Sequence, residues 1–394
     1  MNQKYVILRS TPQAATRRFG MPRAGTAAVV PASSAKVEVG DLEPRSAASL
    51  ARKKDIMAVA PVIPMKLIAP VAIDALTVTA ADGVTWGVRA VGADTSPFTG
   101  EGIIVAVLDT GIDPSHPAFA GVNIIRKNFT AASDDDEDGH GTHCAGTICG
   151  RNVSGTRIGV APGIDKVLVG KVLGKGGGGS DQILQAIQWA VSGGANVISM
   201  SLGIDFPGYV KALEADNFPT ELATSIALEG YRANLLLFER LALIIAAQNA
   251  FMQTTLLIAA AGNESRRDEN PDFEIAVSPP AVADGFVSVA GVAMFPEGFV
   301  VAPFSNVGAR VSGPGVDVHS AKRGGGLISM SGTSMATPHV AGVAALWAHK
   351  LSLAGELNGK LLADRLVGTA TTAGMKPGFE LGDIGAGLVQ APQN

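Results

Sequence analysis

The chain has 394 residues, a formal net charge of −4 and a composition that is 47% hydrophobic and 17% charged. Since domains usually contain about 100 to 200 residues, this length predicts two domains, and the apolar fraction excludes a largely disordered protein. The small negative charge provides no basic field that would hold a polyanion, so we expect no nucleic-acid partner.

The N-terminal segment has no apolar core of the kind that a secretory signal requires. No apolar run reaches the roughly 18 residues that span a bilayer. We therefore expect neither a signal peptide nor a transmembrane segment, no membrane partner, and a protein that is cytoplasmic or secreted by a non-classical route.

The first 75 residues differ in pattern from the rest of the chain. Strand-like stretches at 4–10, 36–39 and 56–68 flank an Ala- and Arg-rich passage, and prolines punctuate residues 61–70 as in a linker. We predict a small α+β domain with its linker at residues 1–75 and a larger domain at residues 76–394.

From residue 103 onward, short apolar runs alternate with helical patterns. This alternation predicts an α/β fold with a mainly parallel sheet covered by helices on both faces. Strands are expected at 103–108, 166–173, 196–202, 255–261 and 286–292, and helices at 140–150, 180–194, 219–248 and 334–352. Because the last helix is apolar on nearly every side, we expect it to be buried.

The stretch 204–253 is an extended, helix-rich segment with a wide apolar face. We expect much of it to pack onto the core. A protruding helical pair that covers the cleft or forms a dimer contact is the alternative, and the sequence leaves the oligomeric state open.

Ser334 lies at the start of the buried helix, where a serine is either an N-cap or a nucleophile. A nucleophilic serine needs a histidine to take its proton and a carboxylate to hold that histidine. Asp109 follows the strand 103–108, and His140 lies between two glycines at a helix start. The carboxyl edge of a parallel sheet is where such groups gather.

The stretches "VLDTGID", "GHGTHCAG" and "GTSMATPHVAG" resemble the three active-site blocks of the subtilisin-like serine peptidases, the subtilase family or peptidase S8. The resemblance runs from about residue 86 to 388. It implies a subtilisin-like three-layer fold and a serine endopeptidase that works through an acyl-enzyme. The implied catalytic residues are Asp109, His140 and Ser334, with Asn263 as the donor to the oxyanion.

Two further segments, "SMSLG" and "KGGGGS", resemble those between which the family binds an extended peptide. Their small residues allow a substrate backbone to approach and pair as an added strand. The alternative is that the glycine run is only a flexible loop. The substrate-binding residues implied are Gly177, Gly178, Ser201, Leu202, Gly203, Ala260 and Gly262.

Residues 1–75 fit the family's propeptide, which inhibits by laying its last strand through the cleft, and an unrelated accessory domain is the alternative. We expect self-cleavage of this zymogen between residues 64 and 81. The partners expected are therefore a polypeptide substrate and the chain's own propeptide. Two rival functions are a non-catalytic, peptide-binding pseudoenzyme and a peptide ligase or macrocyclase that uses the same acyl-enzyme.

Calcium is common in the family, but the position that often supplies an acidic ligand is Ala118 here, and residues 151–159 fit the ligand loop poorly. The acidic run 134–138 is expected to be a solvated loop. We therefore predict no certain cofactor and no metal ligand, with Ca²⁺ as the possible exception. His143 is expected to be structural, and Cys144 and Cys149 to be free thiols, since their side chains diverge on one helix.

Overall fold

The computed structural model describes residues 2–11, 34–72, 83–249 and 253–394. Its central sheet contains β5 (Ile104–Asp109), β6 (Asn123–Asn128), β7 (Lys166–Lys171), β9 (Val197–Met200), β11 (Leu256–Ala260), β12 (Phe286–Phe295), β13 (Gly298–Val301) and β14 (Val311–Pro314). The strand order is β13-β12-β11-β9-β5-β7-β6, with β14 also paired to β12. Only the β12–β13 pair of this sheet is antiparallel, so the predicted mainly parallel sheet is confirmed.

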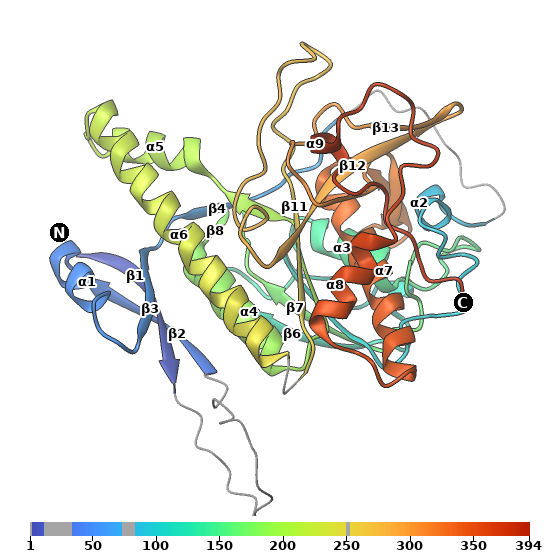
Figure 1. Ribbon diagram of the computed structural model, residues 1–394, viewed down its shortest axis with the longest axis horizontal. Helices are drawn as coiled ribbons and strands as arrows, with labels where there is room; N and C mark the ends of the chain where they lie inside the picture. The colour runs from blue at the N-terminus through green and yellow to red at the C-terminus, as the bar shows by residue number, and fades with distance from the viewer. Residues whose placement is uncertain (1, 12–33, 73–82, 250–252) are drawn as a thin grey trace, which may run out of the picture.

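Helices cover both faces of this sheet and give three layers (Figure 1). The helices α3 (His140–Cys149) and α7 (Thr333–Leu353) pack on one face, and α4 (Ser180–Ser192) and α6 (Thr220–Gln248) on the other. Since successive strand side chains point to opposite faces, Val107 belongs to the first cluster and Leu108 to the second. The two-sided burial explains the continuously apolar strands, and the three-layer α/β fold is confirmed.

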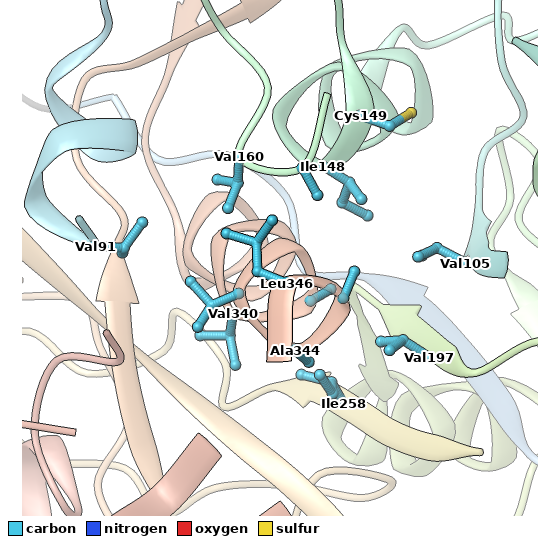
Figure 2. Packing of buried hydrophobic residues seen from close by; sticks show 14 of the residues in the cluster. Val91, Val105, Ile148, Cys149, Val160, Val197, Ile258, Val340, Ala344 and Leu346 are labelled. Atoms are coloured by element: carbon cyan, nitrogen blue, oxygen red, sulfur yellow. The ribbon is translucent and has the colours of Figure 1, made fainter. Parts of the chain in front are cut away.

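The predicted burial of the last helix is also confirmed. Figure 2 shows α7 enclosed by side chains of α3, the sheet and a connecting loop, among them Ile148, Val160, Val197 and Ile258. Alanines at several buried positions of α7 let these neighbours approach the helix backbone closely.

The start of α7 decides whether Ser334 caps the helix. The N-cap is Gly332, so Ser334 is the second helical residue and does not cap the helix. Pro338 lies inside the helix and not in its first turn. Because proline has no N–H to give to the carbonyl four residues earlier, the carbonyl oxygen of Ser334 is free to accept other hydrogen bonds.

The shorter elements border the layers. They are α2 (Trp86–Ala90), the 3₁₀ helix Pro117–Phe119, α5 (Phe206–Ala215), the hairpin of β15 (Val318–Ala321) and β16 (Leu327–Met330), α8 (Gly359–Gly368) and α9 (Leu381–Ile384). Across the part of the chain that the structure describes, no helix combines the length and the apolar character that crossing a membrane demands.

The N-terminal region forms its own antiparallel sheet with the order β2-β1-β3. Its elements are β1 (Gln3–Thr11), β2 (Ser34–Leu42), α1 (Pro44–Leu50) and β3 (Ile56–Pro61). This sheet packs on α6 and α4, where Asn234 Nδ2 donates to the Pro61 carbonyl at 2.8 Å and Gln188 Oε1 accepts from Val37 N at 3.3 Å. The boundary predicted after residue 75 lies within 73–82, outside the described residues.

The passage between residues 61 and 70 is not the linker that its prolines suggested. It contains β4 (Pro64–Leu67), which lies between β8 (Gly178–Gly179) and β10 (Leu202–Ile204) in a three-stranded antiparallel sheet. The neighbouring strands present backbone N–H and C=O groups on both sides of β4. In an extended conformation the passage can form hydrogen bonds with these groups.

Candidate active site

The first pair of candidate catalytic residues is joined by a buried hydrogen bond. β5 ends at Asp109 and α3 begins at His140, and Nδ1 of His140 lies 2.8 Å from Oδ1 of Asp109. Since a carboxylate can only accept, Nδ1 carries the proton and Nε2 is left with its lone pair. No hydrogen-bond partner of Nε2 is found among the described residues. His140 therefore presents a free basic nitrogen.

Two opposing effects set the proton affinity of this imidazole. Burial, the largest single effect, disfavours the charged imidazolium, but the adjacent Asp109 carboxylate and the Cys144 side chain together outweigh burial and raise the pKa of His140 well above its ordinary value of 6.5. Oδ1 of Asp109 also accepts from the backbone N–H of Thr110 at 2.7 Å, which fixes the carboxylate in place.

A second buried carboxylate, Asp136, binds the two segments that carry this pair. Its Oδ1 accepts from Thr110 Oγ1 at 2.8 Å and from Gly139 N at 2.8 Å, and its Oδ2 accepts from Thr142 N and Oγ1 at 2.9 and 2.6 Å. Burial alone would raise the pKa of Asp136, but these hydrogen bonds lower it below 3.8. The expectation that the whole run 134–138 is solvated is wrong at this position, because Asp136 ties the end of β5 to the start of α3.

Ser334 lies close to the segment that follows β4. Its hydroxyl donates to the carbonyl oxygen of Ile68. Its own carbonyl, left without an intrahelical donor by Pro338, accepts from Ser201 Oγ at 3.2 Å and Cys144 Sγ at 3.4 Å. The first turn of α7 is thereby attached to the β9–β10 segment and to α3.

Asn263 follows β11 and faces the same segment. Its Oδ1 accepts from both N and Oγ1 of Thr333 at 2.8 Å, which leaves Nδ2 to donate to the Ala69 carbonyl at 2.9 Å. An added Cβ at Gly332 would lie 2.9 Å from Nδ2 of Asn263 and 3.1 Å from Oγ of Ser334. Only a residue without a side chain leaves the Asn263 amide free to bind the Ala69 carbonyl beside Ser334. We call this place the carbonyl site.

The predicted substrate-binding segments hold β4 as an extended peptide. Leu202 and Gly203 are opposite Leu67 and Lys66, and Gly178 is opposite Met65. The Ser201 carbonyl accepts from Ile68 N at 3.2 Å. The glycine run is thus part of a paired strand and its flanking turn, and the flexible-loop alternative is wrong.

Gly177 contacts the same peptide from the turn before β8. It has a φ of +84°, and a Cβ there would come within 2.5 Å of the Met65 carbonyl. Ala260 lies buried in β11 and Gly262 follows it, and no hydrogen bond joins either residue to β4 within the described ranges. The structure thus pairs Gly178, Leu202 and Gly203 with the peptide. Ala260 and Gly262 are at and just after the end of β11, before Asn263 in the sequence.

The other histidine and the cysteines of α3 have structural surroundings. Nε2 of His143 donates to the Val318 carbonyl at 2.9 Å, and burial lowers the pKa of His143 to about 3. Cys144 and Cys149 are free, as predicted, and burial raises the pKa of both thiols, that of Cys149 to about 12. Neutral thiols of this kind are poor nucleophiles.

The residues around Ala118 do not fit a calcium ion. Ala118 offers no carboxylate, and the guanidinium of Arg151 donates to the carbonyls of Cys149, Pro162 and Ile164. The second arginine of the loop, Arg157, donates to the carbonyls of Ala93, Gly159 and Val160. Guanidinium groups occupy the acceptors that a hard cation would otherwise use.

Sequence reasoning did not find three of the residues described above. Asp136 is one of several acidic residues in a row, so nothing in the run distinguishes it. The one available signal is its position three residues before Gly139 at a helix start, which is typical of a capping side chain. Ile68 and Ala69 are ordinary apolar residues whose backbone carbonyls matter, so no side-chain pattern could reveal them.

Comparison with known proteins gives the family. The model of the subtilase family matches residues 100–387, and this chain belongs to that family. It is 37% identical over 278 residues to a thermostable alkaline protease of Halalkalibacterium halodurans, covering 68% of this chain and 64% of that protein. It is 36% identical over 282 residues to the M-protease of Shouchella clausii, covering 69% and 62%.

An intracellular serine protease of Paenibacillus polymyxa is 35% identical over 259 residues, covering 63% of this chain and 67% of that protein. The chain thus spans somewhat less than two thirds of the length of the Halalkalibacterium and Shouchella relatives.

Replacing Gly332 with alanine tests the carbonyl site. Because the new Cβ would displace the Asn263 amide, we expect Gly332→Ala to lower kcat for a peptide substrate by about 10²-fold, as when an oxyanion donor is removed in a subtilisin. Steady-state kinetics measures the effect. Gly382→Ala is the matched control, since a Cβ there meets nothing within 4 Å. Equal kcat values for the two variants would contradict this account of Gly332.

Proposed function

We propose that this protein is a serine endopeptidase in which Ser334 is the nucleophile, His140 the general base and Asp109 the group that orients it. One observation supports this above the others. An extended peptide, β4 with Ile68 and Ala69, lies paired between β8 and β10 with its carbonyls on Ser334 and Asn263. The site thus holds a peptide backbone beside a hydroxyl and an amide donor, and Cys144 Sγ lies 3.7 Å from Nδ1 of His140 and 3.4 Å from the Ser334 carbonyl oxygen.

In the proposed reaction the Ser334 hydroxyl leaves Ile68 and turns to Nε2 of His140. Nε2 takes the proton as Oγ attacks the substrate carbonyl carbon, and the amide of Asn263 donates to the oxygen that becomes negative. His140 then gives the proton to the leaving amine, and a serine ester remains. Water, deprotonated by the same nitrogen, hydrolyses the ester and restores the hydroxyl.

The Asp109 carboxylate stabilises the imidazolium that forms twice in each turnover. Asp136 acts through this pair as a positioning residue, because it fixes Thr110 and the first turn of α3.

We also propose that the N-terminal region is a propeptide that inhibits the site and is removed by the enzyme itself. The contacts of Asn234 with Pro61 and of β4 in the groove support this, since the N-terminal sheet delivers β4 to the place where a substrate would pair. An occupied groove excludes other peptides, so the unprocessed chain is expected to be inactive.

Expression of the parent and of Ser334→Ala tests self-processing. The parent is expected to lose its N-terminal region by a cut between residues 64 and 81, whereas Ser334→Ala, which lacks the nucleophile, stays at full length. Intact-mass measurement of both proteins gives the result. Identical processing of the two chains would show that another protease makes the cut.

Digestion of a peptide library with the processed enzyme, followed by mass spectrometry, separates the rival functions. Fragments whose summed mass has gained one water support hydrolysis. Products joined to an amine without that gain would assign the acyl-enzyme to ligation, and unchanged peptides would assign the groove to binding alone.

The pH dependence of activity follows from the Asp109–His140 pair. Only the neutral imidazole accepts a proton, so kcat/KM should rise with pH through the pKa of His140. Because Asp109 raises that pKa, we expect the midpoint of the rise to lie above 6.5. Asp109→Asn should shift the midpoint downward and lower kcat by about 10⁴-fold. A parent midpoint at or below 6.5 would be inconsistent with the coupling.

We propose further that the region around Ala118 needs no calcium, because Arg151 already binds the carbonyls of Cys149 and Ile164. A chelator should leave the melting temperature of the parent unchanged. Arg151→Ala should lower the free energy of unfolding by about 1 to 3 kcal/mol, since buried carbonyls lose their donors. Thermal denaturation measures both, with Arg126→Ala on the exposed side of β6 as control. A large rise in the parent's melting temperature on adding calcium would refute the proposal.

A further inference from the structure

The outward face of α6 carries an unusual number of exposed apolar side chains. The helix has 29 residues and runs diagonally across the front of the molecule in Figure 1. Ten large hydrophobic side chains are exposed in the described parts of the chain, and four of them are on this helix, namely Leu222, Leu228, Leu236 and Leu243. Apolar side chains gathered on one surface mark an interaction site more often than scattered ones do.

Three of these leucines, Leu228, Leu236 and Leu243, belong to a continuous line along the helix. Residues three or four positions apart share a face. This spacing defines the α6 stripe, which consists of Ser225, Leu228, Arg232, Leu236, Glu239, Leu243 and Ala246. Six of these seven side chains are exposed and that of Glu239 is half-buried. With a rise of 1.5 Å per residue the stripe is about 32 Å long, and its spacing is that of a coiled-coil seam.

The α6 stripe is complementary to itself when reversed. About a point between residues 235 and 236, Leu228 is as far to one side as Leu243 is to the other, and the same holds for Arg232 and Glu239. Ser225 and Ala246, both small, form the outermost pair. A second α6 laid antiparallel on the first therefore sets leucine against leucine, and Arg232 of each copy against Glu239 of the other.

The two charged residues of the stripe are free to make this contact. Neither Arg232 nor Glu239 takes part in a salt bridge with any of the residues that the structure describes. They are also two helical turns apart, too distant to pair along one helix. Two opposite charges held apart on one chain are thus matched by the same two charges of a reversed copy.

A hollow beside the stripe matches the same arrangement. It has a volume of about 390 Å³ and is lined by residues of α6 and by the turn before β12, including Leu236, Leu243, Ala246 and Asp284. Since the reversed copy brings its Leu228 opposite Leu243, that leucine would arrive next to this hollow. Shape and charge therefore favour the same register.

We propose that the α6 stripe is a homodimer interface in which two copies of this chain pair their α6 helices antiparallel about a two-fold axis. A single helical seam buries less than the roughly 800 Å² per partner of a standard stable interface. The dimer is therefore reversible and forms as the protein concentration rises. The proposal does not depend on the catalytic assignment, because it concerns the opposite face of α6 from the one that contacts the core.

Sedimentation velocity of the full chain over a range of concentrations tests the dimer. The Ser334→Ala background prevents self-digestion during the run. We expect a shift from monomer to dimer with concentration. Arg232→Glu and Glu239→Arg should each weaken the dimer at least tenfold, because each places like charges opposite one another twice.

Mixing the two charge-reversed variants provides the specific test. In the mixed pair every position opposite a glutamate is an arginine, so the mixture should dimerise as well as the parent does. Lys211→Glu, a matched charge reversal on the exposed surface of α5, should have no effect. Circular dichroism checks that the exposed substitutions leave the fold intact.

Three results would overturn the proposal. The first is a monomer at every concentration. The second is a dimer that neither charge reversal nor Leu243→Arg weakens, since this would place the interface elsewhere. The third is a mixture of Arg232→Glu and Glu239→Arg that stays monomeric, since this would exclude the antiparallel register.

Discussion

The buried hydrogen bond between Asp109 and His140 is the interaction on which the site depends. A carboxylate at about 1% exposure is costly unless it is hydrogen-bonded, and here the imidazole and the Thr110 N–H stabilise it together. Asp136 then fixes Thr110 and the first turn of α3. Buried hydrogen bonds thus join the end of β5 to the start of α3. They hold the His140 imidazole in a single orientation.

The N-terminal sheet and the central sheet are connected through the same region. β4 is paired on both edges, so the chain that leaves the small sheet ends against Ser334 and Asn263. Backbone pairing of this kind depends little on side chains, which explains why short residues such as Gly178 and Gly203 flank the peptide. Folding of the N-terminal region and occupation of the groove are therefore linked, because only residues 62 and 63 separate β3 from β4.

Much of this arrangement could be predicted from the sequence. Two-sided apolar strands such as 103–108 predict a covered parallel sheet, and the motifs that carry Asp109 and His140 indicate the pair of side chains that meet. The start of α7 was placed within one residue, but its capping residue was not predicted, because a serine before an apolar helix is typical of a cap, whereas Gly332 caps the helix through its backbone. The prolines of 61–70 suggested a linker, since the pattern does not show that two distant strands would pair with them. Asp136 was missed because burial depends on tertiary contacts that no local pattern contains.

Pro338 has a consequence that extends beyond its own helix. An ordinary α-helix secures its first turn with its own backbone, but here the carbonyl of Ser334 relies on a hydroxyl from Ser201 and a thiol from Cys144. The location of the Ser334 hydroxyl is therefore decided by three separate parts of the chain at once. A displacement of the Ser201 segment or of α3 would therefore move this hydroxyl even if the backbone of α7 kept its helical form.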